Sequence, residues 1–215
     1  EQAAVRRRGH VTSAARRGGW GDRDRFALTT ALLCAVGGVL IWVFWVFPVA
    51  ASVDAADTHP MGEDALVELD AGERVGIWGR GISANLGTMT CTVTAPEGDG
   101  VATSSGPSLD WSDTLWWMTP KRGFEQSAQF TAADDGAHRV SCADSLDTYD
   151  GEFLIAGDSF GGGNIGLGRN GGSDFAIGSL LAFGAVFCPP VAVMLLVIIG
   201  IRLALAKRRS RRVYR

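Results

Sequence analysis

The feature that most constrains the fold is the apolar run from Ala27 to Pro48, which lies in a stretch without charge between Arg25 and Asp54. As a helix rising ~1.5 Å per residue, the run reaches about 33 Å, enough to cross a hydrocarbon layer of roughly 30 Å. A second apolar run, from Phe175 to Ile201, is also long enough. We therefore expect two transmembrane helices, which leave about 125 residues between them, near the common size of one domain.

Charge is unevenly distributed along the chain. The segment between the apolar runs carries most of the 23 acidic residues but only six of the 20 basic ones, and the two tails are rich in arginine. Basic residues beside a membrane span stay on the cytoplasmic side, so we expect both tails inside and the central segment outside. Such clusters usually set topology and contact anionic lipids, and no nucleic-acid motif accompanies them. The expected partner is thus a lipid bilayer, and no nucleic acid.

Six regions follow from these patterns. They are a basic cytoplasmic tail over 1–25, a transmembrane helix over 26–49, an extracytoplasmic β domain over 50–156, a glycine-rich linker over 157–173, a second, kinked transmembrane helix over 174–203 and a basic cytoplasmic tail over 204–215. As an alternative, Val49-Ala50-Ala51 has the small-residue spacing of a signal-peptidase site, although the apolar run is longer than the usual core of ~7 to 15 residues. The first residue is Glu, so the true N-terminus is unknown.

The central segment reads as a set of short β-strands. The clearest strand is Thr88–Ala95, where threonines on one face alternate with Met89, Cys91 and Val93 on the other. Alternation of the same kind occurs around Val67, Ile77, Phe130, Val140 and Ile155, with turn residues between the runs. About six such strands are typical of a sandwich or barrel. The predicted class is membrane α plus all-β, with two helices flanking one antiparallel β-sandwich-like domain.

Two of the four cysteines lie on predicted outer strands. Cys91 and Cys142 both point to the predicted core, and an oxidising compartment favours a disulfide between them. Cys34 and Cys188 lie within the apolar runs, where we expect them to pack as small apolar residues. Immunoglobulin-like domains also bridge two strands, across the sandwich, but Val140 stands where a tyrosine corner requires Tyr. That likeness is architectural and not familial.

The apolar runs contain residues typical of helix contacts. Gly37 and Gly38 offer a surface for a close helix neighbour, although glycine is also simply frequent in membrane helices. Pro48 is expected to end the first helix or kink its last turn, and Pro189 and Pro190 to kink the second. These positions are our candidates for helix packing.

The segment from Trp111 to Met118 is the most unusual part of the outer domain. It contains Trp111, Trp116 and Trp117 beside Met118, and exposed tryptophans mark contacts with partners or membranes. The alternative is that these rings complete the core of a small domain or rest on the bilayer. Both interpretations remain open at this point.

One acidic group resembles a cation-binding loop. Asp144, Asp147, Asp150 and Glu152 are close in sequence and offer the oxygen ligands that Ca²⁺ takes, although their spacing is not that of an EF-hand. A hydrolase or transferase that uses these carboxylates with His138 is a minor alternative. His138 itself fits a core position, and His59 lies in a linker. We predict no catalytic residue and no cofactor.

The order of these parts resembles small two-span membrane proteins of high-GC Gram-positive bacteria, which have a disulfide-bridged outer β domain. The resemblance covers the layout of the whole chain, without a specific motif. It implies a cell-envelope location and no catalytic residues. We therefore expect a non-enzymatic membrane protein whose outer domain binds a protein or envelope component, or serves as an accessory or scaffold subunit. An envelope sensor that signals through its helices is the alternative, and the oligomeric state is unknown.

Overall fold

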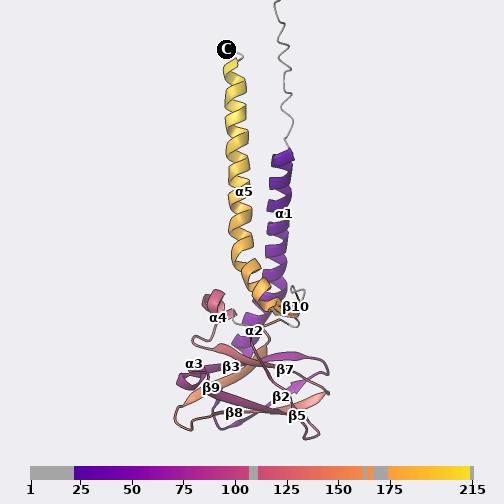
Figure 1. Cartoon of the computed structure of the whole chain (residues 1–215), viewed down its shortest axis with the longest axis vertical. Helices are drawn as coiled ribbons and strands as arrows, with labels where there is room; N and C mark the ends of the chain where they lie inside the picture. The colour runs from indigo at the N-terminus through magenta and orange to yellow at the C-terminus, as the bar shows by residue number, and fades with distance from the viewer. Residues whose placement is uncertain (1–21, 107–110, 162–163, 167–173, 214–215) are drawn as a thin grey trace, which may run out of the picture.

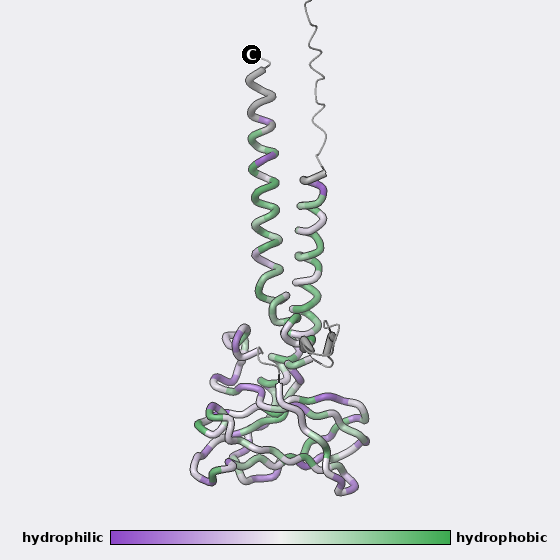
Figure 2. The backbone as a smooth tube through the Cα atoms, viewed as in Figure 1, coloured by the Kyte–Doolittle hydropathy of each residue, from purple (hydrophilic) through white to green (hydrophobic). Residues whose placement is uncertain are grey.

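Two long helices rise from one side of a β domain in the computed structural model, which describes residues 22–106, 111–161, 164–166 and 174–213 (Figure 1). The first rod joins α1 (Asp22–Ile41), a π-helical turn η1 (Trp42–Val46) and α2 (Phe47–Ala55); the second is α5 (Ile177–Val213). Figure 2 shows apolar residues along most of both rods. Both are long and apolar enough to cross a membrane, and less than a quarter of each apolar stretch is buried within the protein.

The first helix continues through Pro48, contrary to the expectation that it ends or kinks there. A proline ring crowds the carbonyl four residues earlier, and proline has no N–H to donate. In η1, the N–H of Phe47 donates to the carbonyl of Trp42, five residues back. This wider π turn, placed directly before Pro48, accommodates the ring within a continuous helix. The helix therefore extends to Ala55, six residues past the predicted boundary at Val49.

The two rods pack antiparallel in one constant register. Three contacts define it: an ion pair of 3.1 Å between Asp24 and Arg202, the approach of Gly38 to Cys188 and Pro189, and a hydrogen bond of 3.1 Å from Trp42 Nε1 to the carbonyl of Ala185. Small buried residues, Ala31, Ala182, Ala185 and Ala192, lie along the contact. α5 stays helical through Pro189 and Pro190, and Figure 1 shows it bending toward the β domain.

The β domain consists of two antiparallel sheets. The five-stranded sheet has the order β1 (His59–Pro60), β9 (Gly151–Gly157), β3 (Arg74–Gly81), β7 (Glu125–Thr131) and β6 (Ser104–Ser105). The four-stranded sheet has the order β2 (Asp64–Leu69), β8 (Gly136–Asp144), β4 (Met89–Thr94) and β5 (Gly100–Val101). Consecutive strands β2, β3 and β4 alternate between the sheets, so most connections cross the sandwich. Shorter elements are α3 (Ile82–Asn85), α4 (Trp111–Thr114), the 3₁₀ turn η2 (Trp116–Met118) and the pair β10 (Asn164–Gly166) and β11 (Asp174–Ala176).

Both faces of the five-stranded sheet are covered. Side chains of Ile77, Phe130 and Phe153 meet Val93 and Val140 of the other sheet in what we call the inter-sheet cluster. On the opposite face, Trp78 and Leu154 meet Val49 and Val53 of α2 in what we call the helix-side cluster. The alternation predicted for β4 is confirmed, since Val93 is buried and Thr90 and Thr92 are exposed. Because successive side chains of a strand point to opposite faces, the strands of the five-stranded sheet contribute to a different buried cluster on each of its two faces.

The disulfide between Cys91 and Cys142 is present, within the four-stranded sheet. The two residues are direct cross-strand neighbours of β4 and β8, with Cα atoms 4.1 Å apart. The bridge therefore differs from the immunoglobulin arrangement, in which it joins the two sheets. It holds adjacent strands together and leaves the packing between the sheets to apolar contacts.

The first residues of the predicted glycine-rich linker pack against the β domain. Ser159 and Phe160 are buried, and the ring of Phe160 occupies the space where Gly106 has no side chain. The amide of Gly178 at the start of α5 donates to the carbonyl of Phe160 at 2.8 Å. Further along, β10 pairs with β11, and residues 162–163 and 167–173 of the predicted linker lie outside the described residues. The second helix is thus attached to the sandwich directly through Phe160.

Candidate functional site

The tryptophan-rich segment is divided between the core and the surface. Trp111 is 1% exposed, and its ring makes edge contacts with Trp45 and Trp78 at centroid distances of 5.4 and 6.3 Å. Its Nε1 donates to the hydroxyl of Thr119 at 3.0 Å. Burial of this kind explains why α4 lies against the helices: the ring of Trp111 inserts between the first helical rod and the five-stranded sheet. Trp111 is therefore a core residue.

Trp116 and Trp117 remain on the surface, 70% and 55% exposed. The ring of Trp117 lies 5.7 Å from that of Trp42, whose own Nε1 bonds to α5, while Met118 packs against the helix-side cluster. Figure 1 shows α4 beside the end of α5 that is nearest the β domain. The two exposed rings therefore lie where the helices meet the domain.

A groove of about 510 Å³ opens beside these rings. Its lining includes Trp116, Trp117, Thr119, Arg122, Phe124 and Glu125. Arg122 and Glu125 are exposed, and among the described residues neither has an ion-pair partner. The groove thus presents one cation, one anion and two indole rings.

The turn that carries Arg122 is fastened on both sides. Lys121 Nζ donates to the carbonyl of Ala56, just past the end of α2, and Phe124 is buried beneath the guanidinium of Arg80 at 4.8 Å. Between these anchors, Gly123 adopts φ +83°, a conformation that side chains disfavour. Because its neighbours are held, the turn directs Arg122 outward. The local sequence pattern did not predict this groove. Arg122 lies in the turn before β7, and Glu125 is the first residue of that strand, so neither residue belongs to a recognisable motif.

Of the candidate helix-packing residues, the structure brings Gly38 and Pro189 together, and Cys188 lies beside them. A Cβ added to Gly38 would lie 3.4 Å from that of Cys188, whereas one added to Gly37 would meet nothing within 4 Å. Cys34 and Cys188 both remain free thiols. Pro190 follows Pro189 in the same turn of α5, and it is not among the nearest neighbours of Gly38. Close packing therefore uses one of the two predicted glycines.

Three members of the acidic group, Asp144, Asp147 and Asp150, line one pocket of about 200 Å³, and Glu152 is not part of its lining. Asp144 accepts hydrogen bonds from the hydroxyl of Thr88 and, at 2.9 and 3.0 Å, from the amides of Thr148 and Tyr149. The Thr88 hydroxyl, followed by these amides, lowers the pKa of Asp144 to about 2. Glu152 pairs with Arg80 in another strand. Within the described residues, no three His, Cys, Asp or Glu side chains are arranged to hold a metal ion.

The two outer histidines lie in different surroundings. His138 is fully buried, with Nδ1 3.0 Å from the carbonyl of Gly136, and its Nε2 has no hydrogen-bond partner among the residues that the structure describes. His59, which was expected in a linker, belongs to β1, and its ring lies 5.6 Å from that of Phe153. His138 faces the inside of the sandwich, whereas Asp147 and Asp150 are exposed on the loop after β8. His138 does not line the pocket that Asp144, Asp147 and Asp150 share, so these carboxylates are not gathered around this histidine.

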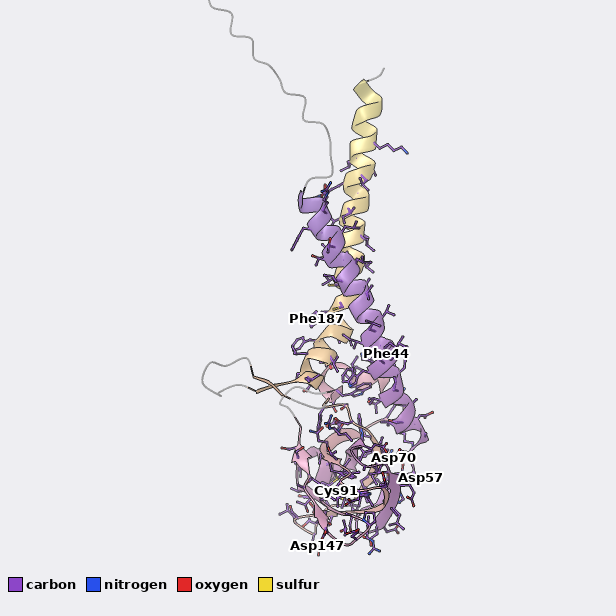
Figure 3. All side chains as sticks on the ribbon, turned by 90° about the vertical axis from the view of Figure 1, so that its right-hand side faces the viewer. Phe44, Asp57, Asp70, Cys91, Asp147 and Phe187 are labelled. Carbon is purple, nitrogen blue, oxygen red and sulfur yellow. A yellow bond between two sulfur atoms is a disulfide. The ribbon has the colours of Figure 1, made fainter. Side chains whose placement is uncertain are left out.

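A second surface feature was not expected from the sequence. Ile82 in α3, Leu86 directly after α3 and Leu146 on the loop after β8 are 56%, 59% and 57% exposed. Backbone bonding joins these two segments, since the amide of Ser145 donates to the carbonyl of Thr88 at 2.9 Å. Figure 3 shows Asp147, next to Leu146, at the end of the domain away from the helices, and Figure 1 shows α3 at the side of the domain. We call these three side chains the distal apolar patch.

Comparison with known proteins yields no matching family model and no matching curated protein.

Proposed function

We propose that this is an integral membrane protein with both termini in the cytoplasm and the β domain outside. The helix register supports this placement. Asp24 and Arg202 pair at one end, and Trp42 bonds to Ala185 at the other. The 18 residues from Asp24 to Trp42 rise about 27 Å, close to the roughly 30 Å of a hydrocarbon core. Charged groups at one end and aromatic rings at the other are typical of the two boundaries of a span.

Cysteine labelling in intact cells tests this topology. In a background with Cys34→Ala and Cys188→Ala, one variant carries Leu146→Cys on the outer domain and another carries Lys207→Cys near the end of α5. A membrane-impermeant maleimide is expected to label the first variant in intact cells and the second only after the membrane is opened. Labelling of Lys207→Cys in intact cells, or protection of Leu146→Cys, would contradict the proposed orientation.

The proposed role is non-enzymatic: the β domain acts as a binding module, an accessory or scaffold subunit of a cell-envelope assembly. The observation that carries this proposal is the burial of α2 in the domain. Val49 and Val53 of α2, with Val46 at the end of η1, are at most 5% exposed and pack in one cluster with Trp78 and Trp111. The domain is thus joined to the first helix through its own core rather than through a tether. Such a joint holds a binding face at a fixed height above the bilayer, which is what a scaffold requires.

The distal apolar patch is the face that we propose for the partner. Exposed leucines gathered on two joined loops favour protein contact, and acidic residues such as Asp147 and Asp150 border them. A photo-crosslinking residue placed at Leu86 or Leu146 is expected to give one discrete higher-mass product in cells. The matched control is Leu66, 68% exposed on edge strand β2. Equal products from all three sites, or none from Leu86 and Leu146, would contradict this assignment.

A sensor role is the second candidate, supported by the attachment of both helices to the domain. α2 is buried in the helix-side cluster, and α5 begins at the hydrogen bond between Gly178 and Phe160. A change in the domain would therefore act on both helices and on the bend near Pro189. Replacing Pro189 and Pro190 with alanine is expected to abolish transmission of a change in the β domain to the cytoplasmic ends of the helices. The photo-crosslinked product obtained from Leu86 or Leu146 is expected to stay unchanged. Loss of the product would instead indicate a purely structural effect.

A further inference from the structure

We propose that the groove beside Trp116 and Trp117 binds the zwitterionic headgroup of a phospholipid, phosphatidylethanolamine, in the outer leaflet. In this arrangement Arg122 holds the phosphate and Glu125 holds the ammonium group. The inference rests on the membrane placement proposed above and is independent of the distal apolar patch. It adds a specific ligand to a surface that otherwise only touches the bilayer.

The height of the groove is the first argument. Trp42 lies at the outer end of the span, with its Nε1 on Ala185, and the ring of Trp117 lies 5.7 Å from the ring of Trp42. Indole rings prefer the headgroup boundary because they combine an apolar body with a polar N–H. Figure 3 shows Phe44 and Phe187 on the two helices at the same end of the rods. The groove therefore opens at the level of lipid headgroups.

The charge pattern of the groove is the second argument. A guanidinium forms paired hydrogen bonds to a phosphate, and a carboxylate accepts the N–H groups of a primary ammonium. Arg122 and Glu125 offer these two groups three residues apart, and both lack an ion-pair partner among the described residues. The exposed rings of Trp116 and Trp117 add an aromatic surface that attracts a cation. An anionic lipid without the ammonium would pair its phosphate with Arg122 and leave the carboxylate of Glu125 beside it without a cationic partner.

The fixed geometry of the turn is the third argument. Lys121 and Phe124 are both engaged, through the carbonyl of Ala56 and through burial under Arg80, so the turn is formed before any lipid binds. A preformed site loses less conformational entropy on binding. The volume of about 510 Å³ lies within the range of small-ligand sites. Phe124 both lines the groove and is buried in the helix-side cluster beneath it, so the groove rests on the core of the protein.

Lipid retention by the full chain tests the proposal. The protein is assembled in nanodiscs that contain equal amounts of phosphatidylethanolamine and phosphatidylglycerol, extracted in mild detergent and examined by native mass spectrometry. We expect phosphatidylethanolamine to be retained about fivefold over phosphatidylglycerol, the ratio expected from one partly exposed charge contact. Glu125→Lys is expected to reverse the preference, because the groove then presents two cations. Arg122→Gln is expected to lower the retention of both lipids.

Glu73→Lys is the matched control, since it makes the same charge change at the turn between β2 and β3. Arg74, the next residue, pairs with Thr131 at the end of β7 opposite to Glu125. This variant is expected to keep the wild-type preference. Equal retention of the two lipids by the wild type, or a shift in Glu73→Lys as large as in Glu125→Lys, would overturn the proposal. A chain that does not stay in the nanodisc would instead contradict the membrane placement, so the two failures are distinguishable.

Discussion

At the scale of single residues, Asp144 is the side chain whose ionisation is coupled most clearly to the fold. The hydroxyl of Thr88 and the amides of Thr148 and Tyr149 all donate to its carboxylate, and they lower its pKa from 3.8 to about 2. A carboxyl with a lower pKa in the folded state stabilises the fold above its unfolded pKa, and this contribution is lost as the pH falls through the folded value. The loop after β8 is thus held by an ionised group.

Replacing Asp144 with asparagine is expected to lower stability at neutral pH, because an amide offers weaker acceptance to the three donors. The difference from the wild type should be constant above about pH 4 and shrink toward pH 2, where the wild-type carboxyl also becomes protonated. Denaturant unfolding at several pH values measures this. Asp147→Asn, on the same loop, is the control and should show no such trend. A difference that persists unchanged at pH 2 would contradict the assignment.

Gly38 and Gly37 make a second matched pair at the residue scale. A side chain at Gly38 would meet Cys188 and Pro189, whereas Gly37 faces open space. We expect Gly38→Leu to separate the helices and lower the stability of the protein in detergent by about 1–3 kcal/mol, the usual effect of overpacking. Gly37→Leu should be neutral or slightly stabilising, since leucine favours a helix more than glycine does. Equal effects, measured as shifts of the thermal midpoint, would show that the helices do not pack through Gly38.

At the scale of elements, the disulfide ties β4 to β8 within one sheet. Its sequence separation of 51 residues corresponds to a stabilisation of about 4 kcal/mol in the chain-entropy model. The double variant Cys91→Ala, Cys142→Ala should lose about this much free energy of unfolding, measured with denaturant. The double variant Cys34→Ala, Cys188→Ala removes as many thiols without removing a bridge and should change stability far less. A reductant should weaken the wild type and leave the first double variant unaffected.

At the scale of the whole molecule, α2 joins the first long helix and the β domain through one shared core. Its buried valines cannot leave the helix-side cluster without exposing Trp78 and Trp111, and Ser52 Oγ accepts the amide of Gly157 in β9 at 2.8 Å. Native-state hydrogen exchange should therefore show the same protection free energy for Val49–Val53 as for the central strand β3. Faster exchange of α2 than of β3 would mean that the helix opens by itself. The variant Val53→Ala should lower both together.

The local sequence determines much of this protein, because periodicity and charge report directly on the surroundings of each residue. Apolar runs of sufficient length indicate two helices that can cross a membrane, and alternation in β4 identifies its buried face. The inward phase of Cys91 and Cys142 identifies the disulfide. The helices and the buried face of β4 can be predicted because each depends on the residue pattern within one element. The disulfide can be predicted because the β domain contains only one pair of cysteines.

Only the tertiary structure decides how the elements share their surfaces. The sequence predicts that the first span ends at Val49, yet the helix continues to Ala55, and Val49 and Val53 form the core beneath the five-stranded sheet. Likewise, Trp111 is buried while Trp116 and Trp117 are exposed, although all three stand in one short segment. The physical reason is that burial depends on the partner surface, and the partners here, Trp45, Trp78 and α5, are brought to this place by segments far apart in the chain.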